Sequence, residues 1–196
     1  MTLLLASILL AGPPATQWNY SDKSDACTFY QGAQEGDVIP IRAECNWAIP
    51  AAVLMDLLDD PTDHDELFST LGEATRVSSK PGGPELIRQV HTPPLIASRE
   101  VVCAVGTEEV PGGKRFTWAK VQDAITHYRG DLVPIAADRG FWEITSDGKG
   151  GAQVVYELHY HPGGGVPTFA MKWFQTSGIS DVLDELQAAG KEAMKR

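Results

Sequence analysis

The sequence predicts an α+β fold in which an antiparallel sheet packs against a long C-terminal helix. Strand-like segments separated by turns rich in glycine and proline follow one another from residue 74 to residue 161. Two short helical segments precede them, and a long amphipathic segment, 167–195, closes the chain. At 196 residues with 43% hydrophobic side chains, the chain suits one domain with a sizeable core.

The N-terminus reads MTLLLASILLAGPPATQ, an apolar run followed by small residues and two prolines. The run is too short to cross a bilayer and fits a secretory signal, although no Lys or Arg precedes it. We therefore expect residues 1–17 to be a signal peptide, cleaved near residues 15–17 from a secreted or periplasmic protein. The remaining residues, 18–196, would form the domain. If the run is not a signal, the protein would be cytoplasmic. No other stretch is long and apolar enough to predict a transmembrane helix.

Residues 26–31 and 38–47 read as a hairpin with a turn at Gly36. Pro40 suggests that the second strand is an edge strand or contains a bulge. If the turn centres on Gly36, Cys27 and Cys45 are equally far from it and lie opposite each other. An oxidising compartment would let them form a disulfide, leaving Cys103 as a buried free thiol.

The segment 50–60 predicts a short helix with Pro50 in its first turn and Pro61 after its end. Thr62 is expected to cap a second helix, with Asp65 as its capping-box partner. The strands that follow are expected at 74–79, 86–91, 99–107, 115–121, 132–137, 140–145 and 153–161.

The last of these strands alternates most clearly. Val154, Tyr156, Leu158 and Tyr160 share one face, which we expect to meet the C-terminal helix. Either these side chains line a cavity or they fill a solid core.

The charge and the motifs exclude several classes of function. A net charge of −10 and a pI near 4.9 argue against nucleic acid and against electrostatic attraction to anionic membranes. The sequence contains no nucleophile elbow, phosphate-binding loop or dinucleotide fingerprint. We expect a monomer without a cofactor.

Four segments carry a family resemblance: residues 49–60 (IPAAVLMDLLDD), HTPP of residues 91–94 with REVV of 99–102, GFW of 140–142, and HPGGGVP of 161–167. In this order they resemble the first helix, the "P…RDfV" stretch, the "G-x-W" strand and the "DPGG-x-iP" turn of START domains, a helix-grip family, especially its bacterial members. Glu100 and His161 replace the family's Asp. The resemblance covers about Cys27 to Ala189. It implies a curved antiparallel sheet wrapped around the C-terminal helix, with a lipid, sterol or other apolar molecule bound between them. It does not name the ligand.

Large rings on both the strands and the helix should hold these layers apart and leave a pocket. We expect ligand contacts from Arg99, Val101, Cys103, Trp118, Trp142, Tyr156, Leu158, Phe169, Trp173 and Phe174. Arg99 and Glu100 are adjacent and point to opposite faces, so one of them faces the interior. There it would orient a polar ligand head; the alternative is a surface ion pair.

Two further alternatives concern chemistry. Glu157, His159 and His161 alternate on the other face of the last strand and could bind zinc, although a solvated outer face explains them equally well. A cyclase- or hydrolase-like enzyme would need convergent titratable groups in the cavity, and the sequence offers only Arg99 and Glu100. A purely structural interaction domain would need a filled core. We therefore favour binding, with or without transfer between membranes, over catalysis.

Overall fold

The computed structural model describes residues 17–195, apart from residues 25, 95, 123, 125–126 and 168–176. The strands of the described residues are β1 (Trp18–Lys23), β2 (Cys27–Gly32), β3 (Ile41–Trp47), β4 (Leu71–Val77), β5 (Glu85–His91), β6 (Arg99–Val110), β7 (Gly113–Lys120), β8 (Val133–Pro134), β9 (Ala137–Ser146) and β10 (Ala152–His161). The helices of the same residues are α1 (Ala51–Leu58), α2 (His64–Leu67) and α4 (Ser177–Ala193).

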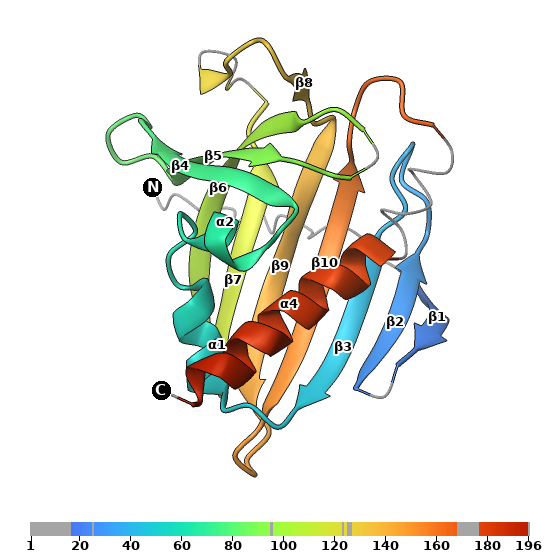
Figure 1. Ribbon diagram of the computed structural model, residues 1–196, viewed down its shortest axis with the longest axis vertical. Helices are drawn as coiled ribbons and strands as arrows, with labels where there is room; N and C mark the ends of the chain where they lie inside the picture. Colours follow the sequence, from blue (N-terminus) through green and yellow to red (C-terminus); the bar gives the residue numbers. More distant parts are fainter. Residues whose placement is uncertain are drawn as a thin grey trace, which may run out of the picture.

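One sheet contains all of these strands, in the order β1-β2-β3-β10-β9-β7-β6-β5-β4. Neighbours along this path pair antiparallel, and the short β8 pairs with β6 in parallel. Figure 1 shows α1, α2 and α4 on the same face of the sheet, with α4 running diagonally across β9 and β10. In the same view β4 and β5 run at a steep angle to β9 and β10, so the sheet bends around its helical side. The predicted α+β architecture is confirmed.

The N-terminal hairpin has the predicted register. Cys27 lies opposite Cys45, and the two form a disulfide, while Cys103 is free and buried. Two details differ from the prediction. β3 starts at Ile41 rather than at residue 38, after Pro40, which has no N–H to donate; the carbonyl of Pro40 accepts a hydrogen bond from the Gly32 amide. β1, which pairs with β2 at the sheet edge, was not predicted.

The first helix lies where it was predicted, and the capping prediction for the second is wrong. α2 begins after Asp63, and the hydroxyl of Thr62 donates instead to the Asp60 carboxylate at 2.7 Å. The carboxylate of Asp65 accepts a hydrogen bond from the Ala74 amide in β4, so it ties α2 to the sheet rather than closing a capping box. The C-terminal helix is described from Ser177 onward; the predicted start at Pro167 adjoins residues outside the described part.

The strand boundaries also differ in the middle of the chain. β4 starts at Leu71, ahead of the predicted residue 74, with an irregular register between Leu71 and Glu73. The segment 132–137 is not a full strand: β8 contains two residues, and β9 already begins at Ala137. This earlier start places Asp138 inside β9, where it pairs with Tyr160 of β10.

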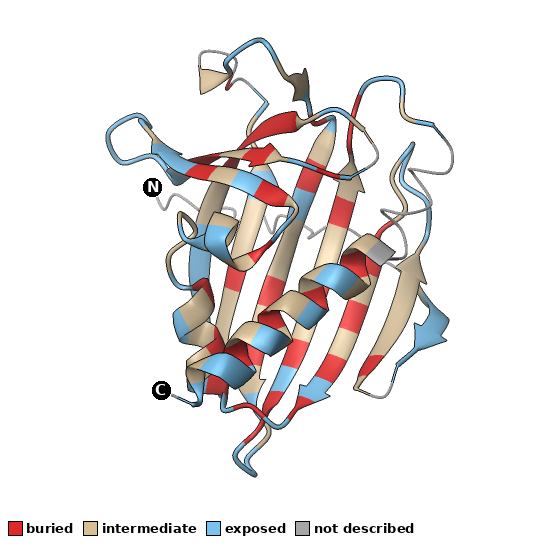
Figure 2. Cartoon of the chain, viewed as in Figure 1, coloured by how far each residue is buried: buried red, intermediate tan, exposed pale blue. Residues whose placement is uncertain are grey.

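The core lies between the sheet and α4. Leu183 and Leu186 of α4 are buried together with Leu54 of α1, Ile144 of β9 and Val154 of β10. Figure 2 shows the buried residues of α4 along its sheet-facing side and the exposed ones on the opposite side. Gly190 allows the close approach of α4 to α1, because a Cβ at this position would come within 2.8 Å of Leu54 Cδ2.

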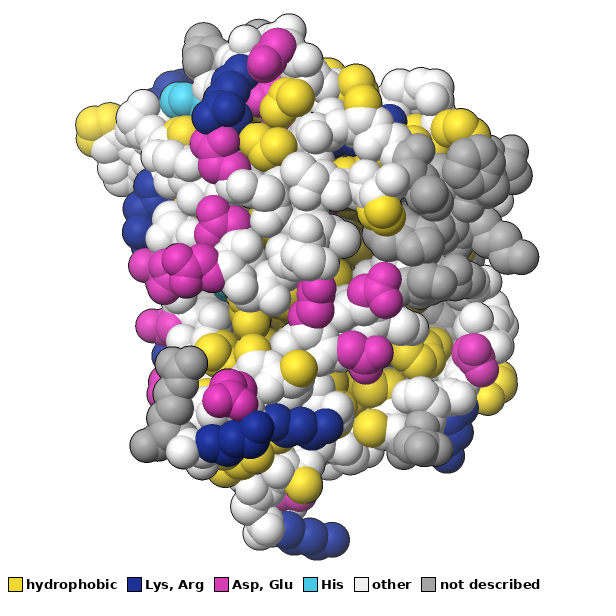
Figure 3. Space-filling model, viewed as in Figure 1, with side chains coloured by type: hydrophobic (Ala, Val, Ile, Leu, Met, Phe, Trp, Pro, Cys, Tyr) yellow, Lys and Arg dark blue, Asp and Glu magenta, His cyan; other side chains and the backbone are white. Residues whose placement is uncertain are grey.

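The outer surface of the helical side carries many acidic groups, as Figure 3 shows, in keeping with the net charge of −10. Among the described residues, no helix combines the length and hydropathy that a bilayer-spanning helix needs.

Candidate ligand cavity

A cavity of about 240 Å³ lies between the sheet and the start of α4. Its floor comes from the inner faces of β5, β6, β7, β9 and β10, and its cover from the end of α1, α2 and the first turns of α4. Most of its lining is apolar, including Leu71, Val105, Phe116, Ile179 and Val182. A cavity with such a lining can take up an apolar molecule.

Aromatic rings form one continuous wall of the cavity. The ring centroids of Trp142 and Tyr156 lie 4.1 Å apart, and those of Trp118 and Tyr156 lie 6.0 Å apart. Phe68, which directly follows α2, stacks on Trp142 with a centroid distance of 6.1 Å and an angle of 3° between the rings. These rings extend from the sheet to α2, so they keep α2 and the sheet apart as well as providing apolar surface.

Gly140 makes this wall possible. A Cβ at Gly140 would lie 2.6 Å from Cζ2 of Trp118 and would also collide with the Glu157 carbonyl of the neighbouring strand. The glycine of the Gly140-Phe141-Trp142 segment therefore allows the Trp118 ring to lie against β9.

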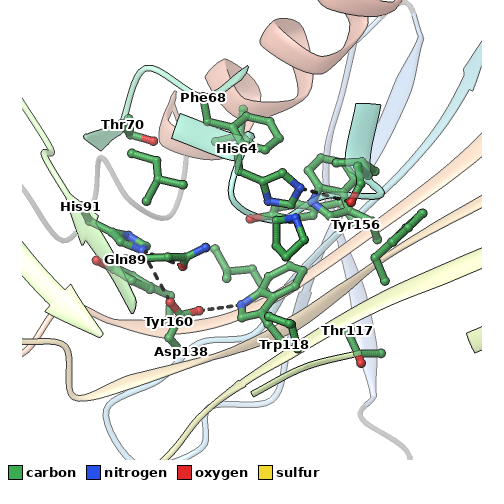
Figure 4. A pocket seen from close by; sticks show the side chains of 18 of the residues that line it. His64, Phe68, Thr70, Gln89, His91, Thr117, Trp118, Asp138, Tyr156 and Tyr160 are labelled. Atoms are coloured by element: carbon green, nitrogen blue, oxygen red, sulfur yellow. Dashed lines mark hydrogen bonds and ion pairs between the residues drawn. The ribbon is translucent and has the colours of Figure 1, made fainter. Parts of the chain in front are cut away.

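One group of polar side chains in the cavity lies around Asp138 (Figure 4). Oδ1 of Asp138 accepts a hydrogen bond from Nε1 of Trp118 at 2.7 Å, and Oδ2 lies 3.9 Å from Nε2 of His91. Asp138 is only 4% exposed. Burial therefore raises the pKa of Asp138 to about 7, although the Trp118 hydrogen bond and the nearby Lys120 oppose this shift.

His91 is the other titratable group at this polar end. Its ring stacks on Tyr160 at a centroid distance of 5.8 Å, and Nε2 lies 3.4 Å from Oε1 of Gln89. Burial lowers the pKa of His91 to about 4, so the imidazole is neutral near pH 7. Burial also raises the pKa of Tyr156 and of Tyr160. None of these side chains carries a positive charge near neutral pH.

The structure brings four of the predicted contact residues together. Trp118, Trp142, Tyr156 and Leu158 all line the cavity. Val101 and Cys103 are fully buried in a second cluster with Ile135, against which Trp118 and Tyr160 pack, and neither lines the cavity. Phe169, Trp173 and Phe174 lie outside the described residues. Ligand contacts by these last five residues stay predictions.

Arg99 and Glu100 are both buried, but they do not contact each other through a described ion pair. Glu100 is paired with Arg88 and accepts hydrogen bonds from the amides of Arg129 and Gly130. Arg99 donates to the Ala97 carbonyl. Neither side chain lines the cavity, so their position gives no support to the predicted contact with a ligand head.

The polar end of the cavity was not predicted from the sequence. Asp138 falls in the gap between the predicted strands 132–137 and 140–145, so it was not placed on either of them. Continuous alternation through Asp138, Gly140 and Trp142 would have placed the carboxylate on the inner face. His91 was noted only as part of the HTPP segment, without a place in the cavity. No local pattern indicates that β5 and β9 bring His91 close to Asp138, because β6 and β7 lie between these strands.

The strand-borne zinc alternative has no support in the geometry. Nε2 of His159 lies 3.1 Å from Glu157, and its Nδ1 lies 3.0 Å from Arg139, a cation that would repel a metal. His161 instead accepts a hydrogen bond from the Gly163 amide. In the described part of the chain, no group of three His, Cys, Asp or Glu side chains is arranged to hold a metal ion.

Comparison of the sequence with known proteins does not assign the chain to a family. No protein-family model matches the chain. An uncharacterized protein of Pseudomonas aeruginosa is 20% identical over 195 residues, which cover 98% of this chain and 96% of that protein.

Comparison of the structure gives clear matches. A STAR-related lipid transfer protein from Xanthomonas axonopodis superposes with a TM-score of 0.74 at 18% identity, covering 89% of this chain and 98% of that one. Human StAR-related lipid transfer protein 5 gives a TM-score of 0.76 at 15% identity, covering 89% and 86%. The ZhuI aromatase/cyclase from Streptomyces gives 0.55 at 12% identity, covering 80% and 94%. Proteins with related folds thus include both lipid transfer proteins and a cyclase.

Proposed function

The chain has the START fold, and we propose that it binds a lipid-like or other apolar small molecule in the cavity under α4 without transforming it. The observation that carries this proposal is the cavity itself, a space of about 240 Å³ with a mostly apolar lining. The lipid transfer proteins among its structural neighbours support the same conclusion. The proposed contacts are Trp118, Trp142, Tyr156 and Leu158, together with Phe68 and His91.

Filling the cavity tests this proposal. Leu158 lies in the cavity lining and is only partly buried, so Leu158→Trp should occupy ligand space at a cost of about 1–3 kcal/mol in stability. Uptake of the neutral dye N-phenyl-1-naphthylamine, measured by fluorescence enhancement, should be strong in the wild type and lost in the variant. Gln153→Trp is the control, because Gln153 is exposed on the other face of β10 and its ring would not reach the cavity. If the wild type takes up no dye and Leu158→Trp unfolds the protein, the space is part of a solid core and the proposal fails.

A second candidate function rests on one observation: two titratable groups, His91 and Asp138, converge in the cavity with shifted pKa values. Such a pair could exchange protons with a bound molecule, as a cavity enzyme would require. Mass spectrometry of the ligand that copurifies from the natural host, before and after incubation with fresh protein, separates the two functions. Conversion that is lost in His91→Gln would establish an enzyme, and an unchanged ligand would leave binding.

We further propose that the protein is exported and that residues 18–196 are the mature domain. The disulfide between Cys27 and Cys45 suits an oxidising compartment, and cleavage near residues 15–17 would leave β1 intact. N-terminal sequencing of the protein from its natural source should find a start near residue 16, and an intact Met1 would refute the proposal.

A further inference from the structure

The geometry of the polar end points to the chemistry of the ligand head: we infer that the cavity selects ligands ending in a single uncharged hydroxyl group, which would bridge His91 and Asp138. This inference rests on the proposed function, because it names the class of ligand that the same cavity takes. It concerns the donors and acceptors that the described residues present to a ligand.

The first argument is the spacing of the two polar atoms. Nε2 of His91 and Oδ2 of Asp138 lie 3.9 Å apart, which is too long for a direct hydrogen bond. One oxygen atom between them can lie within hydrogen-bond distance of both. Among the described residues, Oδ2 accepts no hydrogen bond, since Trp118 donates to Oδ1. A buried carboxylate oxygen in this position gains a partner when a donor binds.

The second argument is the direction of the hydrogen bonds. Nε2 of His91 faces two oxygen atoms, Oε1 of Gln89 at 3.4 Å and Oδ2 of Asp138 at 3.9 Å. Because both oxygens can accept a hydrogen bond when Asp138 is ionised, we assign the proton of the neutral imidazole to Nε2, where it acts as a donor. The site offers one donor, His91, and one acceptor, Asp138. A hydroxyl group both accepts and donates, so it satisfies both atoms with a single oxygen.

The third argument is the charge of the lining. The described lining residues include the three acids Asp59, Glu85 and Asp138 and contain no Lys or Arg. Asp59 and Glu85 are exposed and paired with Lys114 and Arg76, so only Asp138 is a buried acid in the lining. A carboxylate head would lie against the ionised Asp138 with no Lys or Arg in the described lining to balance it, and it could only accept hydrogen bonds. An ammonium head could pair with Asp138, but it would be costlier to desolvate than a hydroxyl, and because it could only donate it would leave the donating Nε2 of His91 without an acceptor.

Three ligands of equal chain length test the inference: decan-1-ol, decanoate and decylammonium, each displacing N-phenyl-1-naphthylamine at about pH 8.5, where Asp138, whose pKa is about 7, is ionised and can only accept. We expect decan-1-ol to displace the dye at a concentration about tenfold lower than either charged ligand. Equal or tighter binding of decanoate or decylammonium, in a protein that does take up the dye, would overturn the inference and leave the proposed function intact. Failure of the wild type to take up any dye would instead refute the proposed function and the inference that depends on it.

Asp138→Asn provides the sharper measurement. The amide oxygen can keep the hydrogen bond from Trp118, while the amide nitrogen then faces the ligand as a second donor beside His91. A site with two donors suits a carboxylate. The preference for decan-1-ol over decanoate should therefore shrink to about threefold or reverse. An unchanged preference would contradict the assignment of Asp138 as the acceptor.

Two further variants control for folding and for general charge. His91→Phe keeps a ring for stacking on Tyr160 but removes the donor, so decan-1-ol should bind several times more weakly while dye uptake remains. This variant keeps the inference testable if Asp138→Asn does not fold. Glu85→Gln also removes an acid from the lining, but an exposed one, and should leave the preference unchanged. If Glu85→Gln changed the preference as much as Asp138→Asn does, the selectivity would come from overall charge rather than from a specific hydrogen bond.

Discussion

The interface between the sheet and α4 has two ends, and the same elements build both. At one end, Ile144 of β9 and Val154 of β10 pack against Leu183 and Leu186 of α4 without a gap, and all four are at most 2% exposed. At the other end, Trp142 and Tyr156 of the same two strands line the cavity below Ile179 and Val182 of the same helix. We call these the packed end and the cavity end.

The difference between the two ends lies in the residue types. Aliphatic side chains at the packed end interlock at close range, and Gly190 lets α4 approach α1. Aromatic side chains at the cavity end stack on one another along the sheet, and through Phe68 they reach α2. Rings that stack side by side form a stiff wall rather than filling the space above it. The packed end thus holds the layers together, and the cavity end is left open at little further cost to stability.

The largest expected effect of a substitution on stability is at the packed end. Leu186 is fully buried, so Leu186→Ala should lower the free energy of unfolding by about 3 kcal/mol. Because Leu186 is not part of the cavity lining, the affinity for N-phenyl-1-naphthylamine should not change. Urea unfolding and dye titration on the same variant measure both quantities. A folded Leu186→Ala protein that no longer takes up the dye would show that the two ends are not independent.

The sequence predicted the strand face that contributes to both ends, but not its division into a packed end and a cavity end. Alternation along a strand places Val154, Tyr156 and Leu158 on one face, and a turn centred on Gly36 places Cys27 opposite Cys45. These are local rules, and the structure follows them. Alternation does not say how far along a face the cavity extends. Val101 and Cys103 therefore lie on the predicted strand but pack in a neighbouring cluster.

The polar end could not be predicted by local rules. Asp138 and His91 meet only because the sheet bends and brings distant segments together, and a three-residue error in the start of β9 hid Asp138. β1 was also missed, because its polar, mostly exposed residues show no alternation to detect.

A second, smaller expected effect is a pH dependence of the stability, which arises from two titratable groups at the cavity end, Asp138 and His91. The folded-state pKa of Asp138, about 7, lies above its ordinary value of 3.8. Folding therefore favours the protonated form, and this contribution to stability is lost as the pH rises from about 4 to 7. The folded-state pKa of His91, about 4, lies below its ordinary value of 6.5, so the contribution of His91 is lost as the pH falls from 6.5 to 4. In the wild type the two contributions largely cancel between these limits.

Replacing either Asp138 or His91 should make the pH-dependent contribution of the other residue to stability measurable. Asp138→Asn should gain stability relative to the wild type as the pH rises, by about 2 kcal/mol between pH 5 and pH 7. His91→Gln should lose stability relative to the wild type over the same range, by a comparable amount, and Leu186→Ala should show no such dependence. Urea unfolding of each variant at both pH values is the measurement. Parallel pH profiles for Asp138→Asn and the wild type would show that the carboxyl group is not desolvated in the folded protein.

The smallest effect on stability is expected from the same substitution at the cavity end. Leu158→Ala removes the same side chain as Leu186→Ala, but Leu158 is only partly buried, and it borders the cavity as well as packing against the core. Its truncation loses few packing contacts and creates no new closed void, so the free energy of unfolding should fall by about 1 kcal/mol or less. The space that it frees adds to the cavity, so dodecan-1-ol should gain affinity relative to decan-1-ol, whereas Leu186→Ala should leave this ratio at its wild-type value. Unfolding and dye displacement on the two leucine variants therefore compare the two ends of the interface with one chemical change. A stability loss at Leu158 equal to that at Leu186, with no change in chain-length preference, would mean that the cavity end is packed as tightly as the other.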